Sequence, residues 1–195
     1  GQLGSIFTII YQYLLDRHIV PTSWKTSTII PVPKKANARQ PNDFRPVALT
    51  PVLAKCMEKV VRSYLLSDLA GQLDPLQFAY KAHRGVEDAC LTLFDLVSKH
   101  LEDSKSYIRI LFIDFSSAFN TVEPLVLLRR LVDFNVNSNI VLWVRDFLKD
   151  RPQRVSVNGV LSDELVLNSG CPQGCLSPTM FSIYYDHMRS NTAVT

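Results

Sequence analysis

The segment Ile110-Leu-Phe-Ile-Asp114-Phe-Ser-Ser-Ala-Phe119 decides the fold that the sequence predicts. Its first four residues are an apolar run, which indicates a strand within residues 107–114 that is buried on both faces. A carboxylate at the end of such a strand is costly unless it is paired or binds a metal ion, so Asp114 is a candidate ligand. The alternative is that Asp114 or Ser116 caps a following helix.

A second unusual stretch is Gly170-Cys-Pro-Gln173-Gly174, which precedes a helix predicted from Ser177 to about residue 188. Two glycines and a proline indicate a tight loop with exposed backbone amides, and a helix N-terminus favours anions. Gln173 is a candidate for hydrogen bonds to a base or a sugar. The alternative is an ordinary turn, but the two stretches together are more specific than either alone.

The remaining pattern predicts a mixed, α+β fold. Apolar residues at helical spacing predict helices over residues 6–15, 51–70, 86–101, 124–134 and 138–149, the second with Thr50 as its N-cap. Residues 26–32 and 45–49 are predicted as a hairpin whose tip carries Lys34, Lys35 and Arg39. Residues 154–157 and 164–167 are predicted as a second hairpin that turns at Asn158-Gly159.

Composition and charge narrow the class of protein. The chain has 195 residues, 47% of them hydrophobic and 20% charged, which suits a globular domain and excludes disorder as the main state. Residues 17–84 hold eleven Lys and Arg against four Asp and Glu, and the rest holds ten against fourteen. This asymmetry suits a protein that grips a polyanion with one part and holds cations with another, the alternative being a solvated surface.

Several classes of segment are not indicated. The sequence has no run of eighteen apolar residues that would predict a membrane-spanning helix, and residues 1–20 lack the pattern of a signal peptide. Cysteines at 56, 90, 171 and 175 are therefore expected to be free thiols, and one C-x3-C spacing without further ligands does not predict zinc. Because the sequence begins with Gly and not with Met, we expect it to be a fragment of a longer protein.

Residues 110–122 resemble the first catalytic motif of reverse transcriptases from non-LTR (LINE-type) retrotransposons, and residues 170–181 resemble the next motif. Three upstream blocks, which begin at Trp24, Asp43 and Asp74, are similar to fingers segments of the same enzymes. The resemblance covers essentially the whole chain. It implies a right-hand polymerase with an N-terminal helical extension (1–24), a fingers-like region (25–105) and a partial palm (106–195), the thumb being absent.

The resemblance also implies roles for individual residues. Asp114, with the backbone carbonyl of Phe115, would coordinate two catalytic divalent ions, normally Mg²⁺ and possibly Mn²⁺ in its place. Phe119 would lie under the sugar of the incoming nucleotide and exclude a 2′-hydroxyl. Gln173 and Gly174 would line the nucleotide and template pocket. Lys34 or Lys35, together with Arg45, would contact the triphosphate from the hairpin. The implied partners are an RNA template, a DNA primer and dNTP, in the nucleus or in a cytoplasmic ribonucleoprotein.

The sequence departs from the family in two places. The third motif, an aromatic residue followed by Ala-Asp-Asp, does not occur, and the only later acid, Asp186, is interpreted as not catalytic. Relatives usually carry one more residue between Cys175 and Leu176, a deletion that would shift the loop against its helix. Because one carboxylate cannot hold two cations tightly, we expect no polymerase activity from this chain alone.

Other readings remain open at this point. A group II intron-like reverse transcriptase or another palm polymerase would share the main motifs. A non-catalytic nucleic-acid-binding remnant of a decayed element would use the basic hairpin without the metal site. An unrelated α+β domain would use neither.

Overall fold

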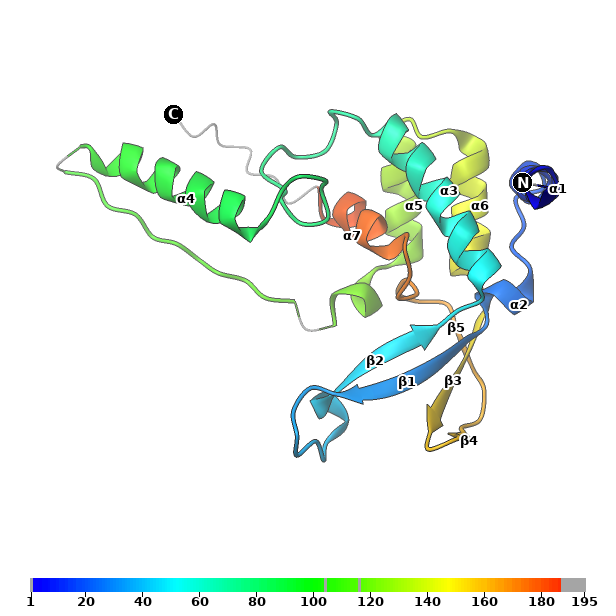
Figure 1. The fold of residues 1–195 in the computed structure, drawn as a ribbon. Helices are drawn as coiled ribbons and strands as arrows, with labels where there is room; N and C mark the ends of the chain where they lie inside the picture. The colour runs from blue at the N-terminus through cyan, green and yellow to red at the C-terminus, as the bar shows by residue number, and fades with distance from the viewer. Residues whose placement is uncertain (1, 104, 116, 187–195) are drawn as a thin grey trace.

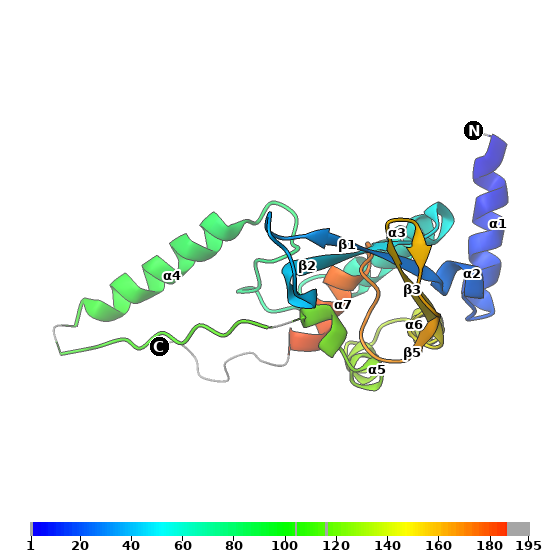
Figure 2. The same ribbon diagram turned by 90° about the horizontal axis from the view of Figure 1, so that it is seen from below.

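The computed structural model describes residues 2–103, 105–115 and 117–186, which form three parts (Figure 1). A bundle of helices holds the core, a small sheet lies at one end of it, and an arm projects sideways. The arm consists of one helix and the extended segment that follows it. Seen from below, this arm and the N-terminal helix lie on opposite sides of the bundle (Figure 2).

The bundle confirms most of the predicted helices. Its members are α1 (Gln2–Asp16), α3 (Val52–Asp68), α5 (Pro124–Asp133), α6 (Ser138–Leu148) and α7 (Ser177–Tyr185). Each contributes an apolar stripe, although α1 reaches the core only through its second half, with Tyr11, Leu14 and Leu15. Burial of each large apolar side chain contributes about 1.5–3 kcal/mol, which makes this cluster the main source of stability. Its fully buried members include Met57, Val61, Leu65, Leu127, Leu131, Trp143, Val144, Leu148, Leu176, Met180 and Ile183.

The first hairpin forms as predicted. Strands β1 (Ser27–Pro33) and β2 (Phe44–Leu49) pair antiparallel after the short helix α2 (Thr22–Lys25). The connection between them contains the 3-10 turn η1 (Pro41–Asp43), and the hairpin tip is exposed to solvent.

The second hairpin forms with a different pairing from the predicted one. Strand β3 (Arg151–Val157) turns at Asn158-Gly159 into β4 (Val160–Leu161), and both turn residues have positive φ, 51° and 82°. Such values favour Asn-Gly in tight hairpins, so the turn itself is confirmed. The later strand β5 (Leu165–Leu167) pairs with the first half of β3 instead. The sequence did not predict that β1 pairs with β3 in parallel, which gives the order β2-β1-β3-β4.

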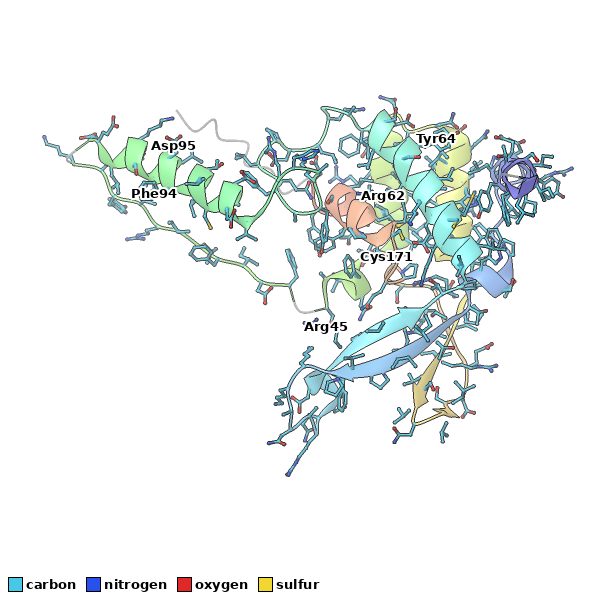
Figure 3. The ribbon with its side chains drawn as sticks, in the orientation of Figure 1. Arg45, Arg62, Tyr64, Phe94, Asp95 and Cys171 are labelled. Atoms are coloured by element: carbon cyan, nitrogen blue, oxygen red, sulfur yellow. The ribbon has the colours of Figure 1, made fainter. Side chains whose placement is uncertain are left out.

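The arm contains the main disagreement with the sequence analysis. Helix α4 (Val86–Leu101) has the predicted bounds, and the Gly85 amide donates to Asp88 Oδ2 at 2.7 Å in its first turn. The apolar run at residues 110–113 is not a buried strand, because its side chains are 48–82% exposed and residues 107–114 pair with none of β1–β5. Phe94 on α4 is 71% exposed and lies away from the bundle (Figure 3). The apolar run at residues 110–113 and the side of α4 that carries Phe94 therefore both lack a covering element within the described residues.

Smaller differences concern helix ends and boundaries. Thr50 is not the N-cap of α3, since Pro51 takes that position and the buried Thr50 hydroxyl finds no hydrogen-bond partner in the described part of the chain. The predicted end of the last helix, residues 187–188, and Ser116 lie outside the described residues. The division at residue 105 stays a prediction, and α3 packs in one core with α5, α6 and α7. In the described ranges, no helix is long and apolar enough to cross a bilayer.

Candidate functional site

The two motif stretches meet where η2 (Ala118–Thr121) crosses the loop before α7. The Cys171 amide donates to the Phe119 carbonyl at 2.9 Å, and the Gly170 amide donates to the Val122 carbonyl at 2.8 Å. Gly170 has φ +67°, and a Cβ there would lie 3.0 Å from both Asn120 Cα and the Phe119 oxygen. Glycine is therefore required for two reasons, its backbone conformation and the closeness of η2.

This double requirement predicts a measurable difference between two glycines. Gly159 also has positive φ (+82°), but a Cβ there would meet nothing within 4 Å. Gly159→Ala is expected to lower the free energy of unfolding by about 1–2 kcal/mol, the cost of the backbone conformation alone. Gly170→Ala should lose a further 1–3 kcal/mol, roughly, from the forced contact. Urea unfolding measures both, and equal losses would show that η2 does not press on the loop.

Aromatic rings anchor the first motif on α7. The Phe119 ring packs edge-to-face on Phe181 with centroids 5.7 Å apart, and Phe115 lies 6.1 Å from Phe181 and 4.5 Å from Tyr185. These contacts fix the backbone on both sides of residues 116–118. Asp114 is thereby held next to the meeting point of the two motifs, although the segment before it runs out into the arm.

Asp114 itself is exposed at the end of the extended segment. Its carboxylate and the carbonyl of Phe115 are hard oxygen donors, which Mg²⁺ and Mn²⁺ prefer. Among the described residues, however, no group of three or more His, Cys, Asp and Glu side chains lies close enough to hold an ion. These two donors alone do not make a metal site, and their role as ligands stays a prediction.

A cavity of about 290 Å³ separates the first hairpin from the motif loop. Its walls come from β1, β2 and β3, from Asn120 of the first motif, and from the loop, where Gln173 contributes. Gln173 forms no hydrogen bond within the described residues and is exposed, so its amide is available to a ligand. Gly174 and Phe119 do not line this cavity, although both adjoin residues that do.

The cations predicted to contact phosphate lie on the hairpin and outside the cavity wall. Lys35 Nζ is 2.7 Å from Asp43 Oδ1, and Lys34 Nζ donates to the Asn42 carbonyl at 3.0 Å. Asp43 also accepts the amides of Gln40 and Arg39, and the Gln40 amide, followed by Lys35, lowers the pKa of its carboxyl. Asp43 thus organises a tip that presents both lysines to solvent.

Arg45 lies on β2, on the side of the hairpin nearest η2 (Figure 3). It is exposed, and it forms no salt bridge with any described residue. A free guanidinium at this place is well suited to a phosphate group, which it can bind through two donors.

The cysteines are free thiols, as predicted. Burial raises the pKa of Cys171 to about 11, so this thiol is neutral at physiological pH and is a poor metal ligand. Asp186 accepts the Asp74 amide at 2.7 Å and thereby ties α7 to the segment after α3. This contact gives Asp186 a structural role, and its interpretation as a non-catalytic residue stays a prediction.

Sequence reasoning missed two buried ionisable residues that hold the loop, Glu58 and Arg151. Glu58 falls on the same helical stripe as Ala54, Val61 and Leu65, so its position predicts burial if the helix is read by register and not by residue type. Arg151 precedes the predicted second hairpin, and nothing in the local sequence indicates that it is buried.

Comparison with known proteins gives one family and a consistent set of relatives. Residues 32–194 match the family described as reverse transcriptase (RNA-dependent DNA polymerase). The chain is 30% identical over 201 residues to the RNA-directed DNA polymerase from mobile element jockey of Drosophila melanogaster, with 100% of the chain and 21% of the relative covered.

Two further relatives agree with this. The Pol polyprotein of a type-1 retrotransposable element R2 from Popillia japonica is 25% identical, with 90% of the chain and 24% of the relative covered. The probable RNA-directed DNA polymerase from transposon X-element of Drosophila melanogaster is 25% identical, with 93% and 20% covered. The chain spans between a fifth and a quarter of the length of these relatives. It belongs to the reverse transcriptase family, as a reverse transcriptase domain of the kind that non-LTR retrotransposons carry.

Proposed function

We propose that this chain forms the fingers and part of the palm of an RNA-directed DNA polymerase that copies RNA from a primer 3′-hydroxyl. The observation that carries the proposal is the convergence of three separate segments. The first hairpin, η2 after Asp114, and the loop with Gln173 all border one cavity. The relatives' names include RNA-directed DNA polymerase, and the match extends over all three segments.

In this proposal, each segment has one task in positioning the substrates. The hairpin cations Lys34, Lys35 and Arg45 neutralise the triphosphate of an incoming dNTP. The ring of Phe119 lies beneath its sugar, and Gln173 with Gly174 borders the base and the template. Preorganised cations and dipoles of this kind stabilise the charge that develops during phosphoryl transfer.

The residues of this chain would supply part of the ligand set for divalent metal ions. Divalent ions, when bound, would stabilise the attacking and leaving oxygens of the displacement. Asp114 and the Phe115 carbonyl would supply two of the oxygen ligands, and the described residues do not complete the set. Apart from these two oxygen donors, the residues that we assign bind or orient a substrate, and a complete metal site needs further carboxylates.

Primer extension tests the proposed function. The natural full-length product that contains this chain should incorporate dNTPs on a primed RNA and should require Mg²⁺ or Mn²⁺. A product that binds primed RNA but incorporates nothing with either ion would favour the alternative, a non-catalytic RNA-binding protein. The basic hairpin and the incomplete ligand set are the observations that keep this alternative in view.

Neutralising the hairpin should weaken dNTP binding more than RNA binding. We expect the triple replacement of Lys34, Lys35 and Arg45 by alanine to raise KM for dNTP at least about tenfold, since each charge-assisted hydrogen bond contributes about 1.5–3 kcal/mol. The matched control replaces three cations far from the hairpin in sequence by alanine. They are Arg129 on α5, Arg145 on α6 and Lys149 directly after α6. The control should leave KM unchanged.

The same triple variant discriminates between the two functions. If the hairpin instead grips RNA, the salt dependence of RNA affinity should fall by about 0.7 for each lost contact, or about 2 in the slope of log K against log salt. That result with an unchanged KM for dNTP would contradict the proposed role of the hairpin.

A further inference from the structure

The loop of residues 169–176, between β5 and α7, is held by two buried ionisable side chains. Glu58 on α3 is 2% exposed and Arg151 at the start of β3 is 6% exposed. Arg151 also lines the cavity described above, whereas Glu58 does not, and neither residue has been assigned a substrate contact. Because buried charges are costly unless they are hydrogen-bonded, the contacts that each one makes indicate what it is for.

Arg151 binds the first part of the loop. Its Nη2 donates to the Gly170 carbonyl at 2.9 Å and also to the Ser169 carbonyl, while Nε donates to the Leu148 carbonyl at 3.2 Å. Burial lowers the pKa of the guanidinium, but it stays charged because arginine does not lose its proton in proteins. One planar side chain thus ties the end of α6 to the beginning of the loop.

Glu58 binds the last part of the loop. Its Oε2 accepts the Leu176 amide at 3.2 Å, and the helix α7 begins at the next residue. Burial raises the pKa of this carboxyl, whereas the amides of Leu176 and Cys175 act in the opposite direction by stabilising its charge. One turn further along α3, Arg62 Nε donates to Thr179 Oγ1 at 3.3 Å, so α3 contacts both the N-cap residue and the first turn of α7.

The carboxylate also explains the second glycine of the motif. A Cβ at Gly174 would overlap Glu58 Oε2 and would lie 2.9 Å from its Cδ. Gly174 therefore lets the acid reach the backbone beyond it.

We propose that Glu58 and Arg151 are positioning residues of the polymerase site, which clamp the loop from opposite ends and so set the direction of Gln173. The assignment rests on the proposed function, since Gln173 matters only if a nucleotide or template lies in the adjacent cavity. Gln173 lies between the two clamped ends and has no hydrogen bond of its own within the described residues. Its orientation consequently depends on the loop backbone.

Hydrogen exchange measured by NMR on the 195-residue chain tests the Glu58 clamp. Glu58→Ala should speed exchange of the Leu176 amide at least about tenfold, and Glu58→Gln, which keeps one acceptor, should restore most of the protection. The Met180 amide, bonded to the Leu176 carbonyl within α7, should change little in both variants. Equal loss at both amides would overturn the proposal, because it would indicate general loosening.

Two control variants distinguish specific loss of the Glu58 contact from general loosening of the fold. Asp68→Asn changes another carboxylate of α3 that accepts a backbone amide, from Asn137, away from the loop, and it should leave the Leu176 amide protected. Leu65→Ala removes a fully buried side chain of the same helix, and it should speed exchange at both amides together. An unchanged Leu176 amide in Glu58→Ala would refute the clamp.

Arg151 is tested by the reactivity of Cys171, which is 4% exposed and lies next to the carbonyls that Arg151 holds. Arg151→Ala should raise alkylation of Cys171 at least about tenfold, while the exposed Cys56 and Cys90 serve as internal controls. An unchanged alkylation rate at Cys171 in Arg151→Ala would overturn the role of Arg151. Equal increases in Arg151→Lys and Arg151→Ala, if both variants had also lost the folded state, would overturn it as well.

Kinetics then separates the clamp from the proposed function. In the natural full-length product, Glu58→Ala should raise KM for dNTP more than it lowers kcat, and Glu58→Gln should recover KM. An inactive wild type would count against the proposed function and leave the exchange result to decide the clamp. Faster exchange at Leu176 with an unchanged KM in an active enzyme would overturn the positioning role.

Discussion

Replacement of Phe119 by valine is expected to raise incorporation of ribonucleotides relative to deoxyribonucleotides by about 100-fold, which is roughly the discrimination that rejection of one hydroxyl can supply. The ring is held in one place, since it packs on Phe181 and the backbone carbonyl of Phe119 accepts the Cys171 amide. A smaller side chain would leave space for a 2′-hydroxyl. The measurement is the ratio of kcat/KM for rNTP and dNTP in the natural full-length product.

The control for this variant is Phe115→Leu. Phe115 packs on the same helix through Phe181 and Tyr185, but its proposed role lies in its carbonyl and not in its ring. We expect this variant to lose some stability and to keep the ratio of the two substrates. If both variants changed the ratio equally, the ring of Phe119 would have no special position beneath the sugar.

Local signals in the sequence were sufficient for most of the helices and both turns. The bounds of α4 follow from Gly85 before it, acids in its first turn and basic residues in its last, all of which favour the helix dipole. The Asn158-Gly159 turn follows from two residues that tolerate positive φ. The meeting of the two motif stretches was expected only from the resemblance, and the hydrogen bonds from Gly170 and Cys171 to the segment 119–122 now give it a structural basis.

Features that depend on distant partners could not be predicted. An apolar run at residues 110–113 indicates burial but not the strand that would cover it, and in the described residues no strand does. The parallel pairing of β1 with β3 joins residues 27–29 to 153–155, which no local pattern marks. The Thr50 cap failed because Pro51 occupies the capping position itself. Glu58 was missed because an acid in an apolar stripe was read by type and not by position.

Asp114 is the residue on which the proposed polymerase activity depends most. It follows the extended segment, and Phe115 beside it is anchored on α7, next to the loop with Gln173. Its exposure leaves the carboxylate open to a cation, which agrees with the proposed role as one ligand of the metal site. Asp186 offers a matched comparison, because it follows Tyr185, which Phe115 contacts, and its carboxylate oxygen already accepts the Asp74 amide.

The most direct measurement is therefore primer extension on RNA by the natural full-length product, with Asp114→Asn compared with Asp186→Asn. We predict that Asp114→Asn lowers kcat by about 10³-fold, because a neutral amide is a poor ligand for a divalent ion. Asp186→Asn keeps an acceptor for the Asp74 amide and should change kcat by less than about threefold. Equal activity of the Asp114→Asn variant and the wild type, or a larger loss at Asp186, would contradict the assignment.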